Sequence, residues 1–212
     1  MLTMIRVSMR ETEISKKQSY VKMDVAIFDV ENLANKEIKL DFSKLEEIYK
    51  RHTNKLVKYA IVGLKGKGYG VAHALSNYNY NIIATNGNCD IALISVLFKH
   101  ILQYKQYYFN KSIKKYIFII TRDGDYTFAV NTIKQIVPNV YIILITAVAN
   151  KYNVKIASNL VHACDKTIIL PNMYLYKENG QEQLFYMQQL AKQLKSKYSK
   201  QQINMLISYL LS

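Results

Sequence analysis

One stretch of the sequence, residues 114–126, constrains the fold more than any other. Its β-branched and aromatic residues run up to Thr121 and predict a buried strand. A helix is predicted soon afterwards, because apolar residues recur on one helical face at Ala129, Val130, Ile133, Ile136 and Val137. Asp123 and Asp125 lie in the turn between these elements, with a glycine between them. Open α/β sheets bind ligands just beyond such strand ends, so this turn is a candidate site.

Helix capping explains one of these two aspartates, because Asp is a preferred residue at helix N-termini. It does not readily explain both, since two neighbouring carboxylates repel each other unless a cation lies between them.

Two further aspartates occur at comparable positions. Asp29 follows a strand predicted over residues 21–28. Asp90 lies in the first turn of a helix predicted over residues 89–107, on the face that carries Ile94, Leu97, Phe98 and Ile101. The structural explanation for Asp90 is a favourable interaction with the helix dipole. If the strands ending at Asp29 and Thr121 are neighbours in a parallel sheet, all four carboxylates converge at one edge.

Strands alternate with helices over about 150 residues, which predicts an α/β fold with a doubly wound, mainly parallel sheet and helices on both faces. The remaining strands are predicted at residues 56–64, 80–85, 140–146 and 167–170, and the remaining helices near residues 43–52, 71–77 and 153–163. We expect three parts: a leader or peripheral segment (1–20), the α/β domain (21–170) and an amphipathic helical extension (171–212).

The extension carries two apolar stripes at helical spacing, separated near Ser199. They comprise Leu184, Met187, Leu190, Ala191 and Leu194, then Ile203, Leu206, Ile207 and Leu210. Isolated helices of this length are marginal in water, so these faces need a partner. The partner is either the α/β domain itself or a second copy of the chain, in which case residues 172–212 would form a homodimer.

The charge of the chain indicates a polyanionic partner. Lys and Arg number 29 against 15 Asp and Glu, a net charge of +14. Nucleic acid is the expected partner, and a merely solubilising surface is the alternative. Two cysteines, without zinc-site spacing, and the lack of any apolar run of membrane-spanning length favour a soluble, cytoplasmic protein.

Four carboxylates without His or Cys form an oxygen-only donor set, which suits Mg²⁺ or Mn²⁺. Such ions activate water and neutralise charge on a phosphodiester. We expect Lys36, Lys65 and Lys67 to lie around the acidic pocket and bind nucleic acid. The glycine-rich loop 65–70 could hold a phosphate at the following helix, or it is a plain turn.

The ordered set of motifs resembles the NYN domain, a branch of the PIN-like metal-dependent ribonucleases. The resemblance covers residues 21–170 and rests on Phe-Asp-Val-Glu-Asn at 28–32, Cys-Asp-Ile-Ala-Leu at 89–93, Thr-Arg-Asp-Gly-Asp-Tyr at 121–126 and the segment 157–165. It implies a Rossmann-like three-layer fold and a metal-dependent endoribonuclease.

The resemblance also implies roles for individual residues. Asp29 would be the central metal ligand and Asp123 its partner, with Asp90 and Asp125 binding directly or through water. Asn32 and Thr121 would support these ligands rather than bind the ion. Two departures stand out: Arg122 replaces the usual glycine, and Ser95 and Val96 stand where the family often has another acid. Arg122 would either shield the pocket or grip a phosphate.

Two other functions remain open. The departures fit a catalytically inactive NYN-like module that binds RNA or protein. A haloacid-dehalogenase-like phosphatase also has an acid after its first strand, but it needs a second Asp where this chain has Glu31. We expect Glu31 to lie on the surface and Asp165 to be a structural turn or capping residue. The helical histidines His73, His100 and His162 are assigned no role.

Overall fold

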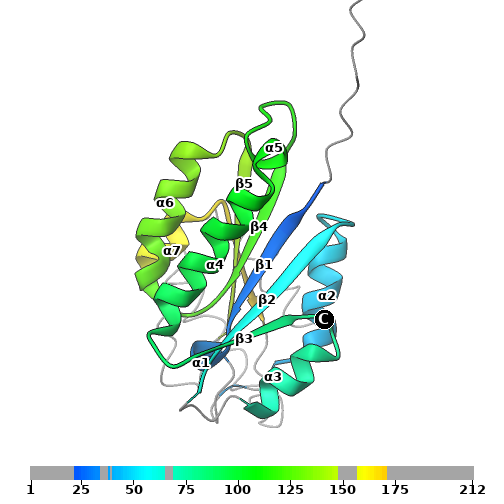
Figure 1. The fold of residues 1–212 in the computed structure, drawn as a ribbon, viewed down its shortest axis with the longest axis vertical. Coiled ribbons are helices and arrows are strands. Elements are labelled where there is room, and N and C mark those ends of the chain that lie inside the picture. Colours follow the sequence, from blue (N-terminus) through cyan, green and yellow to red (C-terminus); the bar gives the residue numbers. More distant parts are fainter. Residues whose placement is uncertain (1–21, 34–37, 39, 65–68, 148–156, 171–212) are drawn as a thin grey trace, which may run out of the picture.

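The computed structural model describes residues 22–33, 38, 40–64, 69–147 and 157–170 (Figure 1). Six strands form one sheet in the order β3-β2-β1-β4-β5-β6, and every pair is parallel. The strands are β1 (Asp24–Asp29), β2 (Leu56–Gly63), β3 (Asn81–Thr85), β4 (Lys115–Ile120), β5 (Val140–Ala147) and β6 (Lys166–Leu170). The predicted parallel α/β sheet is therefore confirmed, and the strands ending at Asp29 and Thr121 are neighbours.

The helices form a layer on each face of this sheet. One layer contains α1 (Val30–Leu33), α2 (Phe42–Lys50) and α3 (Tyr69–Ser76). The other contains α4 (Cys89–Gln103), α5 (Lys105–Tyr108), α6 (Thr127–Ile136) and α7 (Ser158–Ala163), and a short 3₁₀ helix, η1 (Gly124–Tyr126), precedes α6. Figure 1 shows α2 and α3 on the opposite side of the sheet from α4, α6 and α7. The three-layer architecture is thus the expected one.

The central strands consist of apolar residues because both of their faces are covered. Ile27 and Ile119 face the core beneath α4 and α6, whereas Phe28 and Phe118 face the core beneath α2. All six residues of β1 are buried. Parallel strands buried on two sides read as continuous apolar runs rather than alternating patterns, which is why their positions are readable from the sequence.

Some local details differ from expectation. The helix predicted over residues 89–107 ends at Gln103, and a separate turn, α5, follows Tyr104. The short α1 was not predicted; it forms directly after Asp29 because Val30 and Leu33 bury their side chains against the sheet. Ile136 was wrongly placed on the buried face of α6, since it is 45% exposed. Residues 1–21 and 171–212 lie outside the described residues, so the leader, the helical extension and the homodimer stay predictions.

Within the part of the chain that the structure describes, no helix combines the length and apolar character needed to cross a membrane.

Two buried tyrosines join helix α2 to the start of β3. The hydroxyls of Tyr49 and Tyr80 lie 2.7 Å apart and hydrogen bond to each other. Burial raises the pKa of both phenols above the usual value of 10. Folding therefore favours the neutral phenols, and this contribution is complete below pH 10 but is lost as the pH rises further.

This pair predicts alkaline sensitivity. Above pH 10, the free energy of unfolding should fall by about 1.4 kcal/mol per pH unit for each phenol that ionises only on unfolding. The double variant Tyr49→Phe/Tyr80→Phe should reduce that slope, as measured by urea unfolding at several pH values. Tyr78→Phe, at a half-buried position that packs on Phe42, is the matched control. An unchanged slope in the double variant would contradict the assignment.

Candidate functional site

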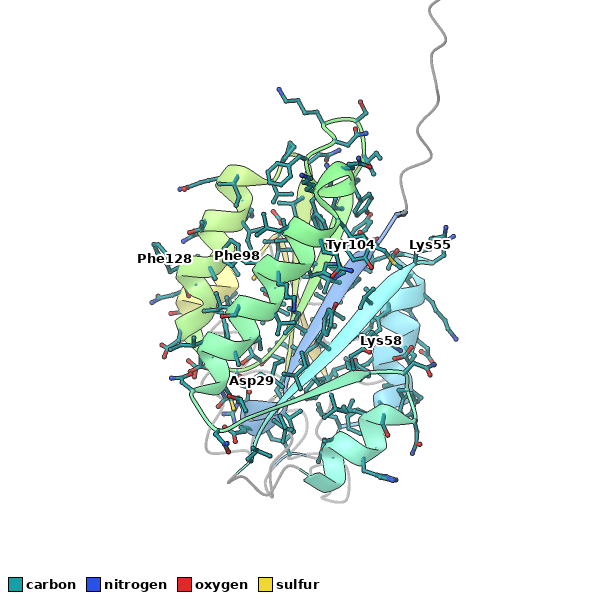
Figure 2. The ribbon with its side chains drawn as sticks, viewed as in Figure 1. Asp29, Lys55, Lys58, Phe98, Tyr104 and Phe128 are labelled. Atoms are coloured by element: carbon teal, nitrogen blue, oxygen red, sulfur yellow. The ribbon has the colours of Figure 1, made fainter. Side chains whose placement is uncertain are left out.

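The candidate site lies where the strand order reverses, between β1 and β4. Asp29 is the last residue of β1, and Thr121 directly follows β4. Figure 2 labels Asp29 at the lower edge of the sheet, where the carboxyl ends of these strands meet. Doubly wound sheets bind their ligands in the crevice outside such a switch point.

Three aspartates converge at this edge. Asp90 lies in the first turn of α4, Asp123 is the N-cap of η1, and Asp125 belongs to η1 itself. Each offers one carboxylate oxygen, and these oxygens all lie within 4.8 Å of one another. Asp90 and Asp123 are half-buried, and Asp125 is exposed. Among the described residues, no other His, Cys, Asp or Glu belongs to this group.

Local capping accounts for only part of this cluster. Asp123 caps η1, because its Oδ1 accepts the Asp125 backbone N–H at 3.0 Å. The cap of α4 is Asn88, whose Oδ1 accepts the Asp90 N–H at 2.7 Å, so Asp90 is not needed as a cap. Helix capping therefore does not explain why the Asp90 and Asp125 side chains and the second oxygen of Asp123 lie together.

Asp29 lies beside these three acids but outside the group whose oxygens are within 4.8 Å of one another, and its expected role as the central metal ligand stays a prediction. Its side chain is 1% exposed, and its Oδ2 accepts three hydrogen bonds: from Asn32 Nδ2 at 2.7 Å, Thr121 Oγ1 at 2.9 Å and the Tyr126 hydroxyl at 2.9 Å. Burial raises the pKa of Asp29, although these hydrogen bonds oppose the shift. Asp29 thus acts as the buried acceptor around which the neighbouring side chains are arranged.

Tyr126 connects the buried carboxylate to the cluster, and sequence reasoning missed it. Its hydroxyl lies 2.9 Å from Asp29 Oδ2 and 2.6 Å from Asp90 Oδ1. A phenol has one proton, so it cannot donate to two ionised carboxylates at once. Burial and both carboxylates raise the pKa of Tyr126, which keeps it a neutral donor. The only signal in the sequence was its place directly after Asp125 in the motif.

Asn32 and Thr121 each contact both Asp29 and Asp123, and their expected support of metal ligands stays a prediction. Asn32 Nδ2 donates to Asp29 and also lies 3.4 Å from Asp123 Oδ2. Thr121 Oγ1 donates to Asp29 and accepts the Asp123 backbone N–H at 3.1 Å. Each residue therefore holds Asp29 and Asp123 in a fixed relation.

Glu31 is exposed, as expected, but it does not simply point away from the site. A Cβ added to Gly63 would overlap the far end of the Glu31 side chain, so the Glu31 carboxylate lies against the end of β2. Burial, together with a hydrogen bond to Glu31, raises the pKa of the Cys89 thiol to about 12. This shift favours the protonated thiol over the reactive thiolate at neutral pH.

Of the cationic residues predicted at the site, the structure describes only Arg122. Arg122 is half-buried beside the cluster in sequence, and its Nε is buried without a hydrogen-bond partner in the described part of the chain. Lys36, Lys65 and Lys67 lie outside the described residues, so their place around the pocket stays a prediction. Asp165 has the expected structural role: it pairs with Lys134 at 2.6 Å and accepts the Ile142 N–H at 2.8 Å.

The donor set fits a hard divalent cation. All three converging groups are carboxylates, and Mg²⁺ and Mn²⁺ prefer oxygen ligands. Like charges this close raise the energy of the site unless a cation or a proton lies among them. Asp90, Asp123 and Asp125 are the residues that would hold such an ion.

Comparisons with known proteins support the fold and do not indicate an activity. No protein-family model and no curated protein matches this chain. The structure is similar to the crystal structure of a protein of unknown function from Vibrio parahaemolyticus, with a TM-score of 0.51 and 12% sequence identity. The similarity covers 72% of this chain and 95% of that one. At this level of identity it supports the α/β fold alone.

The buried position of Asp29 predicts a gain in stability when its charge is removed. Its pKa is raised in the folded state, so the ionised carboxylate destabilises the fold at neutral pH. Asp29→Asn should raise the free energy of unfolding of the metal-free protein by about 0.5–2 kcal/mol, as stabilising substitutions commonly do. The gain should shrink as the pH falls toward the usual Asp value of 3.8.

Urea unfolding at pH 7 and pH 4 measures this difference. Asp165→Asn is the control. It weakens the ion pair with Lys134, so it should lower the free energy of unfolding instead of raising it. A destabilised Asp29→Asn variant at pH 7 would mean that the three hydrogen bonds outweigh the cost of burying the charge.

Proposed function

We propose that the chain is a Mg²⁺- or Mn²⁺-dependent nuclease that hydrolyses phosphodiester bonds of RNA. The observation that carries the proposal is the convergence of Asp90, Asp123 and Asp125 at the switch point of a parallel sheet. Two more features support it: the net charge of +14, which favours polyanions, and the resemblance of the motifs to NYN ribonucleases.

Each part of the site has a task in this reaction. A bound Mg²⁺ or Mn²⁺ would act as a Lewis acid toward the phosphodiester and a water molecule. The Tyr126 hydroxyl, whose one proton is shared between Asp29 and Asp90, lies 2.6 Å from Asp90 Oδ1, and Asn32 and Thr121 contact Asp123. Asp29 holds all three of these supporting side chains. It is a positioning residue in this scheme rather than a ligand.

The burial of Asp29 disfavours a haloacid-dehalogenase-like phosphatase. That mechanism needs the acid after the first strand as a nucleophile, in contact with the substrate. Here Asp29 is 1% exposed and its Oδ2 already accepts three hydrogen bonds. The inactive binding module remains the main alternative, because Arg122 directly precedes Asp123, where the NYN motif usually has glycine.

Cleavage of RNA tests the proposal. Wild-type protein should cut a labelled single-stranded RNA in Mn²⁺, leave 5′-phosphates and lose activity in excess EDTA. Asp123→Asn should lower the rate at least about 100-fold, in line with the loss of a charged group that stabilises the transition state. Single-stranded DNA and a generic phosphatase substrate, assayed in parallel, distinguish ribonuclease, general nuclease and phosphatase.

Glu47→Gln is the matched control for the loss of one carboxylate. Glu47 lies in α2, where its only ion pair is an exposed one with Arg51, among the pairs that the structure describes. This variant should cleave at the wild-type rate. Equal cleavage by Asp123→Asn, or full activity in EDTA, would contradict the metal mechanism. Binding of RNA without cleavage in any divalent ion would favour the inactive module.

A further inference from the structure

The part of the sheet formed by β5 and β6 is buried on its α2 side. Ile143 and Ile145 in β5 are 0% exposed, and Ile168 and Leu170 in β6 are 7% and 2% exposed. These four side chains belong to the apolar cluster that α2 and α3 share, and we call the surface they form the β5–β6 face. All-parallel sheets are covered on both faces. Some part of the chain must therefore pack on the β5–β6 face.

The connections between the strands leave the β5–β6 face without a helix. Parallel strands are joined almost always by right-handed crossovers. The connections from β1 to β2 and from β2 to β3 run toward one end of the sheet and carry α1, α2 and α3. The later connections, to β4, β5 and β6, run in the opposite direction, so α4, α6 and α7 lie on the other face. Among the described residues, no crossover helix is therefore expected over β5 and β6 on the α2 side.

The side-chain contacts of α2 agree with this topology. Glu46 pairs with Lys58 in β2 at 2.8 Å. The Tyr49 ring lies 4.9 Å from the ring of Phe118 in β4. Figure 1 shows α2 and α3 toward β2 and β3, away from β5. These contacts place α2 over the centre of the sheet, so another segment is needed to cover β5 and β6.

Residues 171–212 are the segment best placed to supply this cover. They continue directly from β6, the outer strand of this part of the sheet. Residues 34–39 belong to the connection from β1 to β2, and residues 148–156 to the one from β5 to β6. The crossover rule assigns the first to other strands and the second to the other face. Residues 1–21 lead into β1, which β4 separates from β5.

We propose that residues 172–212 dock on the β5–β6 face of their own chain. The contact is the first predicted apolar stripe: Leu184, Met187, Leu190, Ala191 and Leu194. A helix about 10 Å wide covers two strands that lie about 4.8 Å apart, so one stripe suffices for β5 and β6. Of the two predicted stripes, this one is nearer to β6 in the chain, so the connecting loop costs less conformational entropy to close. The occupant is the chain itself rather than a second copy.

Thiol labelling at position 168 tests the docking. In an Ile168→Cys variant, a maleimide should react slowly at that position, because the docked segment covers it, and peptide mapping separates this thiol from the native ones. Native Cys164 is 2% exposed in the cluster on the opposite face, so it reports whether the domain stays folded. Adding Leu190→Ala and Leu194→Ala should speed labelling at position 168 at least about 30-fold, as expected for truncated buried leucines, while Cys164 stays slow.

Two variants of the extension serve as comparisons. Gln189→Ala/Gln193→Ala is the matched control, because both residues lie in the same predicted helix but off the stripe. It should leave labelling at position 168 as slow as in the intact segment. Leu206→Ala/Leu210→Ala truncates the second stripe instead. Faster labelling with this pair, but not with the first, would overturn the assignment to the first stripe.

Four other results would overturn the proposal. Fast labelling with the intact extension would mean that the face is uncovered. An unchanged rate after Leu190→Ala/Leu194→Ala, with the second stripe intact or truncated, would mean that another segment covers it. Labelling that speeds up on dilution would identify a second copy as the occupant. If the double leucine variant exposes Cys164 as well, the milder Leu194→Ala decides, and equal acceleration at both thiols would then contradict docking on this face.

Discussion

The site depends on one buried carboxylate at the junction of β1 and β4. Asp29 Oδ2 lies within hydrogen-bond distance of Asn32 in α1, Thr121 just after β4 and Tyr126 in η1. Each of these side chains makes a second contact, with Asp123 or Asp90. A charge that is almost inaccessible to water thus sets the positions of acids that are accessible. Replacing Asp29 is therefore expected to disturb the positions of Asp90 and Asp123, even where the substitution raises the free energy of unfolding.

This arrangement works against the stability of the fold. Burial raises the pKa of Asp29, three further carboxylates stand close together, and the single proton of Tyr126 faces two acceptors. Unfavourable contacts of this kind persist only where the surrounding structure stabilises the fold enough to offset them. Here the surroundings are the fully buried apolar residues of β1 and β4. In the proposed function, a cation held by Asp90, Asp123 and Asp125 would offset the repulsion among these three carboxylates.

Much of the fold and part of the site could be predicted from the sequence. Continuous apolar strands reveal a parallel sheet, and the carboxyl ends of adjacent parallel strands share one edge, which places Asp123 and Asp125 near Asp29 and Asp90. The near-complete burial of the Asp29 carboxylate could not be predicted. It depends on the Tyr126 and Thr121 hydroxyls, more than 90 positions away in the chain, and on side-chain directions that no periodicity encodes. The exposure of Ile136 was also missed, because the spacing of apolar residues along a helix does not show where its buried face ends.

The central claim is that Asp90, Asp123 and Asp125 together hold a divalent cation. Titration of the purified protein with Mn²⁺, followed by the electron paramagnetic resonance signal of the free ion, tests it directly. The account predicts that wild-type protein and Glu47→Gln remove the signal saturably, that Mg²⁺ competes, and that Asp123→Asn binds much more weakly. A wild-type protein that leaves the signal of free Mn²⁺ unchanged, or an Asp123→Asn/Asp125→Asn variant that binds as tightly as wild type, would contradict it.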